Sequence, residues 1–155
     1  MRQVRKLQEF CYSNLERGDK VAPKKMKAVG NFKKVNKQVK VKNEMLEKIV
    51  NYLNDKKGED IRIFNVKENN GLWDYFVVCT GTSTTHVKAL RDFVSKEMKQ
   101  LGYSILYKDS GLDSSWVVVD MEEVLVHIFD KDTREYYSLE RLWGDVEENA
   151  GAYIK

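Results

Sequence analysis

The residues best suited to chemistry lie in one continuous run near the carboxyl end of the chain. The segment VVVDMEEVLVHIFDKDTREYYSLERLWGD, residues 117–145, contains aspartates, a pair of glutamates, one histidine, arginines, two adjacent tyrosines and a tryptophan. Asp120 and His127 could pair as the carboxylate and general base of an active site. Tyr, Trp and Arg are also the residue types enriched in protein-binding surfaces. The segment therefore predicts either an active site or a surface that binds another macromolecule.

A catalytic interpretation lacks a nucleophile. Cys79 lies in the apolar run YFVVCT, where apolar neighbours raise the pKa of a thiol, and the other cysteine, Cys11, is remote in sequence. A hydrogen-bonded structural role is the simpler interpretation of His127. His86, His127 and the two cysteines do not have the spacing of zinc ligands. We therefore expect no metal, no cofactor and no catalytic residues.

A second candidate for chemistry is the turn GTSTTH, which follows a predicted strand and opens a predicted helix. Its backbone N–H groups and the hydroxyls of Thr82, Ser83 and Thr84 could hold a phosphate. The turn lacks the second Gly and the Lys of a P-loop, and Ser83 or a neighbouring Thr could simply cap the helix. Nucleotidyltransferases need paired carboxylates on the next strand to bind Mg²⁺, and neither YSILYKD nor WVVVD contains D-x-D. That enzyme class is disfavoured.

The elements that position these residues form a mixed α/β fold, with a five-stranded sheet flanked by helices. Strands are predicted at 61–66, 73–80, 103–109, 116–120 and 123–130, and helices at 44–57, 85–101 and 134–143. The short link between the last two strands predicts an antiparallel pair, and the helix after the second strand is the crossover of a parallel pair. Alternation places His127 on one strand face with Leu125 and Phe129. In the last helix, Tyr136 and Trp143 are expected on one stripe with Leu139 and Leu142.

Charge divides the chain into a basic arm and an acidic body. Residues 1–42 contain 13 Lys and Arg against 3 Asp and Glu, and residues 43–155 contain 14 against 21. The arm is expected to be disordered when free, the domain to span 43–145, and 146–155 to form a short acidic tail. The arm is either a solubilising tail or a contact for the phosphates of RNA. Its candidate RNA-contacting residues are Lys24, Lys25, Lys27, Lys33 and Lys34.

The motifs WDYFVVCTGTSTTHVKAL, WVVVD, VLVHIF and REYYSLERLWGD, in this order, resemble the ribosomal silencing factor family, also called RsfS or Iojap. The resemblance covers residues 44–145. It implies a nucleotidyltransferase-like fold without the catalytic carboxylates, and a protein that is not an enzyme. Members bind the large ribosomal subunit through its ribosomal protein fourteen and sterically block joining of the small subunit. Organellar relatives assist large-subunit assembly, so an assembly factor is the alternative, and the resemblance admits a homodimer in the free protein.

The resemblance also nominates residues. The motif positions are occupied by Asp74, Gly81, Ser83, His86, Trp116, Asp120, His127, Arg134, Tyr137, Leu139, Glu140 and Trp143. The residues expected to bind the large subunit are Trp116, Asp120, Arg134, Tyr136, Tyr137, Glu140, Trp143 and His86. With two cysteines and no apolar run long enough to span a membrane, a bacterial-type cytoplasm is expected, and a mitochondrion or plastid is the alternative.

Overall fold

Two strands with apolar residues on both faces form the centre of the sheet. The computed structural model describes residues 43–70, 72–108 and 115–154. Strands β2 (Tyr75–Gly81) and β5 (Val124–Asp130) pair in parallel along their whole lengths, and nearly every residue in both is buried. Strands of this kind are covered on both faces, which explains their near-continuous apolar sequences.

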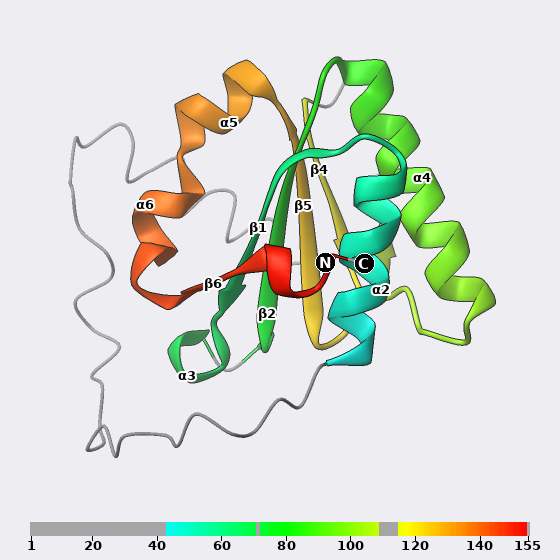
Figure 1. The fold of residues 1–155 in the computed structure, drawn as a ribbon, viewed down its shortest axis with the longest axis horizontal. Helices are drawn as coiled ribbons and strands as arrows, with labels where there is room; N and C mark the ends of the chain where they lie inside the picture. Colours follow the sequence, from blue (N-terminus) through cyan, green and yellow to red (C-terminus); the bar gives the residue numbers. More distant parts are fainter. Residues whose placement is uncertain (1–42, 71, 109–114, 155) are drawn as a thin grey trace.

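The remaining strands extend the sheet on both sides of this pair in the order β3-β4-β5-β2-β1-β6 (Figure 1). Strands β1 (Glu59–Asn65), β3 (Tyr107–Lys108), β4 (Trp116–Asp120) and β6 (Glu147–Glu148) all pair antiparallel to their neighbours. The predicted α/β class and mixed sheet are confirmed. The sheet has six strands rather than five, because β6, from the segment 146–155, pairs with β1.

The predicted helical crossover after β2 is present, but the strand that follows it is not the one that pairs in parallel with β2. Helix α4 carries the chain from β2 to β3, which is only two residues long and lies at the far edge of the sheet. Strand β5 takes the parallel place beside β2. The antiparallel hairpin of β4 and β5 is confirmed, with the three residues 121–123 between the strands.

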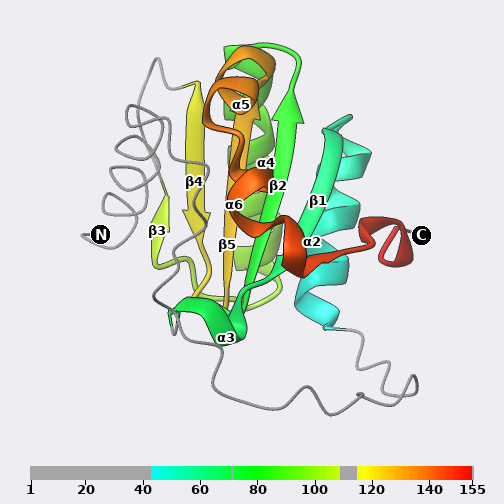
Figure 2. The same cartoon turned by 90° about the vertical axis from the view of Figure 1, so that its left-hand side faces the viewer.

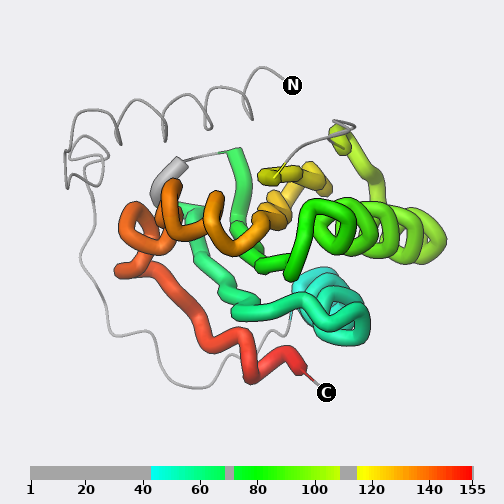
Figure 3. Tube along the Cα trace, turned by 90° about the horizontal axis from the view of Figure 1, so that it is seen from above, coloured from blue at the N-terminus to red at the C-terminus, as the bar shows by residue number. Residues whose placement is uncertain are grey.

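Two long helices cover one face of the sheet (Figures 1 and 3). Helix α2 (Glu44–Asp55) begins at Asn43, whose side chain accepts hydrogen bonds from the first turn, and helix α4 (Thr84–Gln100) begins at Ser83. Their apolar stripes pack on one cluster with strand residues that include Val124, Val126 and Ile128. This layer is the larger half of the core.

The opposite face of the sheet is covered by short elements (Figure 2). Helices α5 (Lys131–Tyr137) and α6 (Leu139–Trp143) lie over it, and α3 (Lys67–Asn70) lies near its lower end. Its cluster contains Leu125 and Phe129, so the predicted division of β5 between two faces is confirmed. The chain then passes through η1 (Gly144–Val146), β6 and η2 (Ala150–Ala152).

A helix that crosses a bilayer must be about 20 residues long and predominantly apolar. Across the described residues, no helix is both long and apolar enough to cross a membrane.

The close approach of β2 to helix α4 gives a testable prediction at Gly81. A Cβ atom there would lie 2.8 Å from Val87 Cγ2 and 2.9 Å from Val87 N. We expect Gly81→Ala to lower the free energy of unfolding by about 1–3 kcal/mol, as overpacking does. In Gly144→Ala, where nothing lies within 4 Å of the added methyl, stability should hold or rise slightly. Urea denaturation of both variants checks this; equal stabilities would contradict it.

Candidate partner-binding surface

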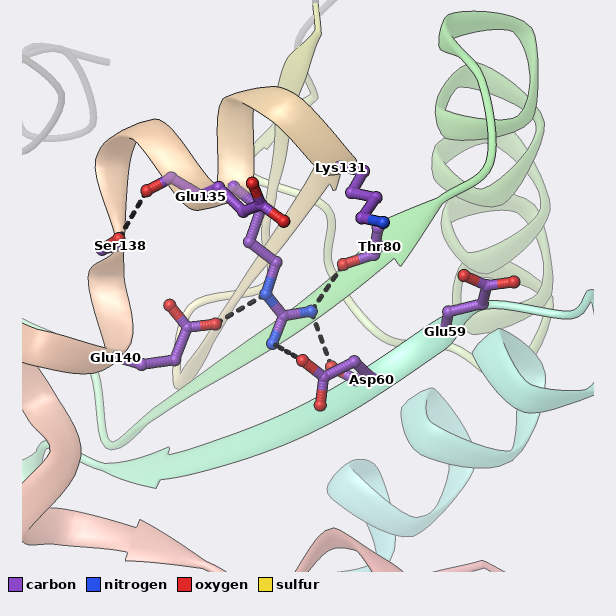
Figure 4. A pocket seen from close by; sticks show the side chains of 8 residues that line it. Glu59, Asp60, Thr80, Lys131, Glu135, Ser138 and Glu140 are labelled. Atoms are coloured by element: carbon purple, nitrogen blue, oxygen red, sulfur yellow. Dashed lines mark hydrogen bonds and ion pairs between the residues drawn. The ribbon is translucent and has the colours of Figure 1, made fainter.

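One buried guanidinium joins four elements beneath helices α5 and α6 (Figure 4). Arg134 Nε donates to Glu140 Oε1 at 2.6 Å, and Nη1 donates to Asp60 O at 2.7 Å and to Thr80 Oγ1 at 2.6 Å. Its Nη2 lies 3.0 Å from Asp60 Oδ2 as an ion pair without the angle of a hydrogen bond. The side chain is 8% exposed. Arg134 therefore fixes α5 and α6 against the ends of β1 and β2.

The backbone around Asp60 is shaped to meet this guanidinium. Asp60 has φ 44° at an irregularity in the β1–β2 register, a left-handed conformation that Asp tolerates better than most residues. Both its carbonyl and its carboxylate oxygens consequently face Arg134. Around this contact lies a hollow of about 350 Å³, lined by Glu59, Asp60, Thr80, Lys131, Arg134, Glu135, Ser138 and Glu140.

The expected single helix over 134–143 is wrong, because the chain breaks at Ser138. This residue has φ 45° and ψ 54°, ends α5 and precedes α6. Its hydroxyl donates to Glu135 O, and its N–H donates to Arg134 O at 2.8 Å. The break removes Tyr136 from the predicted apolar stripe: Tyr136 is 57% exposed, whereas Leu139 and Trp143 are buried.

A stack of aromatic rings connects the sheet to the outer side of α5. Trp116 on β4 stacks on Phe129 with ring centroids 4.8 Å apart, and Tyr137 packs on Trp116 at 4.7 Å. Tyr136 meets Tyr137 edge to face at 5.2 Å. The stack therefore begins in the core and ends at an exposed ring.

We define the α5–β6 surface as the exposed side of residues 131–148. Its sequence contains three basic residues and six acidic ones. Tyr136 and Arg141 are exposed, and Tyr137 and Glu140 are half-buried. Four of the eight nominated residues, Trp116, Asp120, Arg134 and Trp143, are 6–7% exposed. These four can support the surface but offer little area to a partner.

The pairing of Asp120 with His127 that an active site would need is absent, because the hairpin register sets Asp120 opposite Leu125 and His127 opposite Val118. Asp120 instead accepts a hydrogen bond from Trp73 Nε1 at 3.2 Å and from the N–H of Glu122 in the hairpin turn. Asp120 thus ties the hairpin to the segment before β2.

His86 makes its hydrogen bonds in the helical layer rather than to α5 or α6. Its Nδ1 accepts the Thr82 N–H at 3.0 Å, so Nε2 carries the proton and donates to Lys56 O at 2.8 Å. Ser83 Oγ accepts the His86 N–H at 3.1 Å, which confirms that Ser83 caps α4. These bonds occupy the N–H groups of Thr82 and His86 within GTSTTH.

Two buried titratable groups have strongly shifted pKa values. Burial raises the pKa of the Cys79 thiol to about 12, as expected from its apolar neighbours. Burial also lowers the pKa of His127 to about 3, so the imidazole is neutral. Within residues 43–70, 72–108 and 115–154, no group of three or more His, Cys, Asp or Glu residues is arranged to hold a metal ion.

The fold matches solved structures of bacterial proteins. A crystal structure of a protein from Chromobacterium violaceum is similar with a TM-score of 0.63 and 34% identity, over 65% of this chain and 84% of that one. A second, from Bacillus halodurans, has a TM-score of 0.61 and 34% identity, over 68% of this chain and 97% of that one. The class of protein is thus a mixed α/β domain with known bacterial counterparts.

Sequence comparisons identify the family. Residues 39–154 match the model described as ribosomal silencing factor during starvation. Ribosomal silencing factor RsfS of Halalkalibacterium halodurans is 37% identical over 102 residues, which are 66% of this chain and 87% of that protein. The mouse protein named mitochondrial assembly of ribosomal large subunit protein 1 is 33% identical over 101 residues, 63% of this chain and 44% of that protein. The chain belongs to the ribosomal silencing factor family, as its motifs predicted.

Sequence reasoning missed three residues of the site. Asp60 and Thr80 complete the environment of Arg134, and Trp73 donates to Asp120. Nothing in the local pattern marks Asp60 as a ligand of Arg134, because the contact depends on a left-handed backbone conformation 74 residues away. Trp73 carried a detectable signal, since a buried indole N–H usually finds an acceptor.

Arg134 and Arg62 both pair with Asp60, but substitution of Arg134 should destabilise the protein much more than substitution of Arg62. Arg134→Lys removes the fork that reaches Thr80, Asp60 and Glu140 together, so we expect the free energy of unfolding to fall by about 2–3 kcal/mol. Arg62, which pairs with Asp60 at 3.1 Å but is 37% exposed, is the matched control. Arg62→Lys should cost under about 1 kcal/mol in the same denaturation experiment. Similar losses in the two variants would contradict the role of Arg134.

The lowered pKa of His127 predicts acid sensitivity. The unfolded chain takes up a proton near pH 6.5, whereas the folded protein does so only near pH 3. Stability therefore falls as the pH drops below about 6.5, by up to about 1.4 kcal/mol per pH unit. Between pH 7 and pH 5, the wild type should lose about 2 kcal/mol more than His127→Asn in urea denaturation. Equal losses would show that His127 does not titrate in this way.

Proposed function

We propose that this chain binds the large ribosomal subunit through ribosomal protein fourteen and sterically blocks joining of the small subunit, which represses translation. Membership of the ribosomal silencing factor family supports this role. A domain seated where the two subunits meet needs affinity and placement but no chemistry, so the protein acts without catalysis. The observation that carries the proposal is the rigidly supported, acidic and partly aromatic α5–β6 surface.

Charge favours this surface over the helical face as the contact for a basic ribosomal protein. Residues 131–148 contain three basic and six acidic residues, whereas helices α2 and α4 of the helical face together contain five basic and five acidic ones. Opposite potentials on two partners accelerate association and disfavour wrong partners. Tyr136 supplies an exposed ring at the centre of the acidic segment.

The nominated residues divide by their burial into contacts and supports. Tyr136, Tyr137 and Glu140 offer accessible atoms on the α5–β6 surface, beside the exposed Arg141. Trp116, Trp143 and Arg134 support this surface from below, and Asp120 ties the β4–β5 hairpin to the segment before β2. A standard interface of roughly 800 Å² per partner would also include neighbouring residues.

We assign a second contact with the ribosome to the basic arm. Residues 1–42 lie outside the described residues, and the proposal for them rests on charge: Lys24, Lys25, Lys27, Lys33 and Lys34 contact ribosomal RNA. A bacterial-type cytoplasm fits the bacterial relatives, and the mouse and Arabidopsis relatives carry mitochondrial names. In the free protein a homodimer remains part of the proposal.

The second candidate function is large-subunit assembly. The relative from mouse is named for the assembly of the mitochondrial ribosomal large subunit, although the match spans 44% of its length. Binding to precursors rather than to mature subunits distinguishes this function from silencing.

Sedimentation with purified large subunits tests the surface. We expect stoichiometric binding by the full chain and inhibition of small-subunit joining. Tyr136→Ala should weaken binding by about 30-fold, the size of a hot-spot contact of about 2 kcal/mol, and leave the fold intact because the ring is exposed. Leu101→Ala, which removes a 48% exposed side chain at the end of α4, should bind within about threefold of the wild type.

Salt dependence separates the arm from the body in the same experiment. A version that begins at Asn43 should keep specific binding, and the full chain should lose affinity more steeply as salt rises. Unchanged binding by a folded Tyr136→Ala protein would rule out the proposed surface. Binding to assembly precursors but not to mature large subunits would support the assembly function in place of silencing.

A further inference from the structure

The imidazole of His127 is placed where an apolar ring would be more stable. The side chain is fully buried among aromatic rings, 5.1 Å from Phe76 and 6.2 Å from Phe129 between centroids. Its Nδ1 accepts the indole N–H of Trp116 at 3.2 Å, which places the proton on Nε2. That second N–H has no hydrogen-bond partner among the described residues.

An orphaned donor in a core is costly. A buried polar group without a hydrogen-bond partner destabilises the folded protein, and burial also holds the imidazole neutral, with its pKa at about 3. A phenyl ring is somewhat larger but has no polar atom that burial would penalise. What phenylalanine cannot supply is the acceptor for Trp116, so the imidazole contributes orientation rather than stability.

Trp116 is the ring whose orientation matters for the exposed surface. It lies between Phe129 on the sheet and Tyr137 on α5, and Tyr137 in turn supports Tyr136. Stacking alone constrains an indole weakly, because the torsion that turns the ring about its Cβ–Cγ bond is broad. A directional hydrogen bond to one edge of the indole selects a single orientation.

We propose that His127 is a positioning residue for the α5–β6 surface: its Nδ1 atom orients the Trp116 indole, which sets the places of Tyr137 and the exposed Tyr136. Its effect on affinity rests on the proposed function. Its effect on the rings is a property of the free protein and does not.

The test uses two full-length variants: one lacks the hydrogen-bond acceptor for Trp116, and the other lacks the aromatic ring. His127→Phe keeps an aromatic ring and removes the acceptor. His127→Asn loses the ring but keeps an amide oxygen near the place of Nδ1. Large-subunit affinity, urea stability and the NMR signals of the Trp116 indole N–H and the Tyr136 ring are measured for each, with the indole signal assigned from Trp116→Phe.

We expect affinity and stability to rank the variants differently. His127→Phe should weaken subunit binding at least about tenfold and shift the Trp116 indole and Tyr136 signals, although it unfolds at an equal or higher urea concentration than His127→Asn. His127→Asn should bind within about threefold of the wild type and keep a hydrogen-bonded indole signal. In a Trp116→Phe background, His127→Phe should have no further effect on affinity.

Two results would overturn the proposal. One is a large-subunit affinity that ranks the two variants in the same order as their stability, which is expected of a residue that contributes only to packing. The other is a Tyr136 signal that does not change in His127→Phe. If the wild type does not bind large subunits, the proposed function fails, and the ring signals of the free protein still decide whether His127 positions the surface.

Discussion

The parallel pairing of β2 with β5 is the constraint on which the rest of the structure depends. The two strands run side by side from Tyr75 opposite Val124 to Gly81 opposite Asp130, buried on both faces. A parallel pair cannot be closed by a tight turn, so the chain must leave the sheet after β2 and return. Helix α4 provides the exit, and the β4–β5 hairpin provides the return.

The two faces of this pair receive unequal cover, and the difference has functional consequences. The α2–α4 face is covered by helices of 12 and 17 residues, each with a side-chain cap at its start. The other face is covered by helices of seven and five residues that cannot be stable alone and depend on Arg134 and the aromatic stack. The face with little regular structure of its own carries the residues proposed to meet the partner.

The sequence predicted those parts of the fold that are specified locally. Apolar stripes located α2 and α4, and alternation divided β5 correctly between the faces. Strand β6 escaped prediction because Glu147 and Glu148 have low strand propensity and pair with β1, a strand remote in sequence. The helix break escaped because the left-handed conformation of Ser138 is not visible in a helical repeat.

Site residues were predicted by type more successfully than by role. The nominated tryptophans and Arg134 are present beneath the α5–β6 surface, but they are buried, and only Tyr136 among the nominated residues is largely exposed. The pairing considered for Asp120 and His127 depended on the hairpin register, which sets Asp120 opposite Leu125, two positions from His127. Family motifs therefore mark residues that shape a surface as readily as residues that touch a partner.

The two edge strands of the sheet limit how any partner can bind. Both edge strands, β3 and β6, are two residues long, and β6 consists of two glutamates. Short, charged edges offer few free backbone groups and resist the addition of a foreign strand. A partner must consequently contact side chains on a face of the domain rather than pair with an edge strand. The specificity of binding then depends on a few side chains that substitution can change. The same short edges protect the protein from aggregation through sheet pairing.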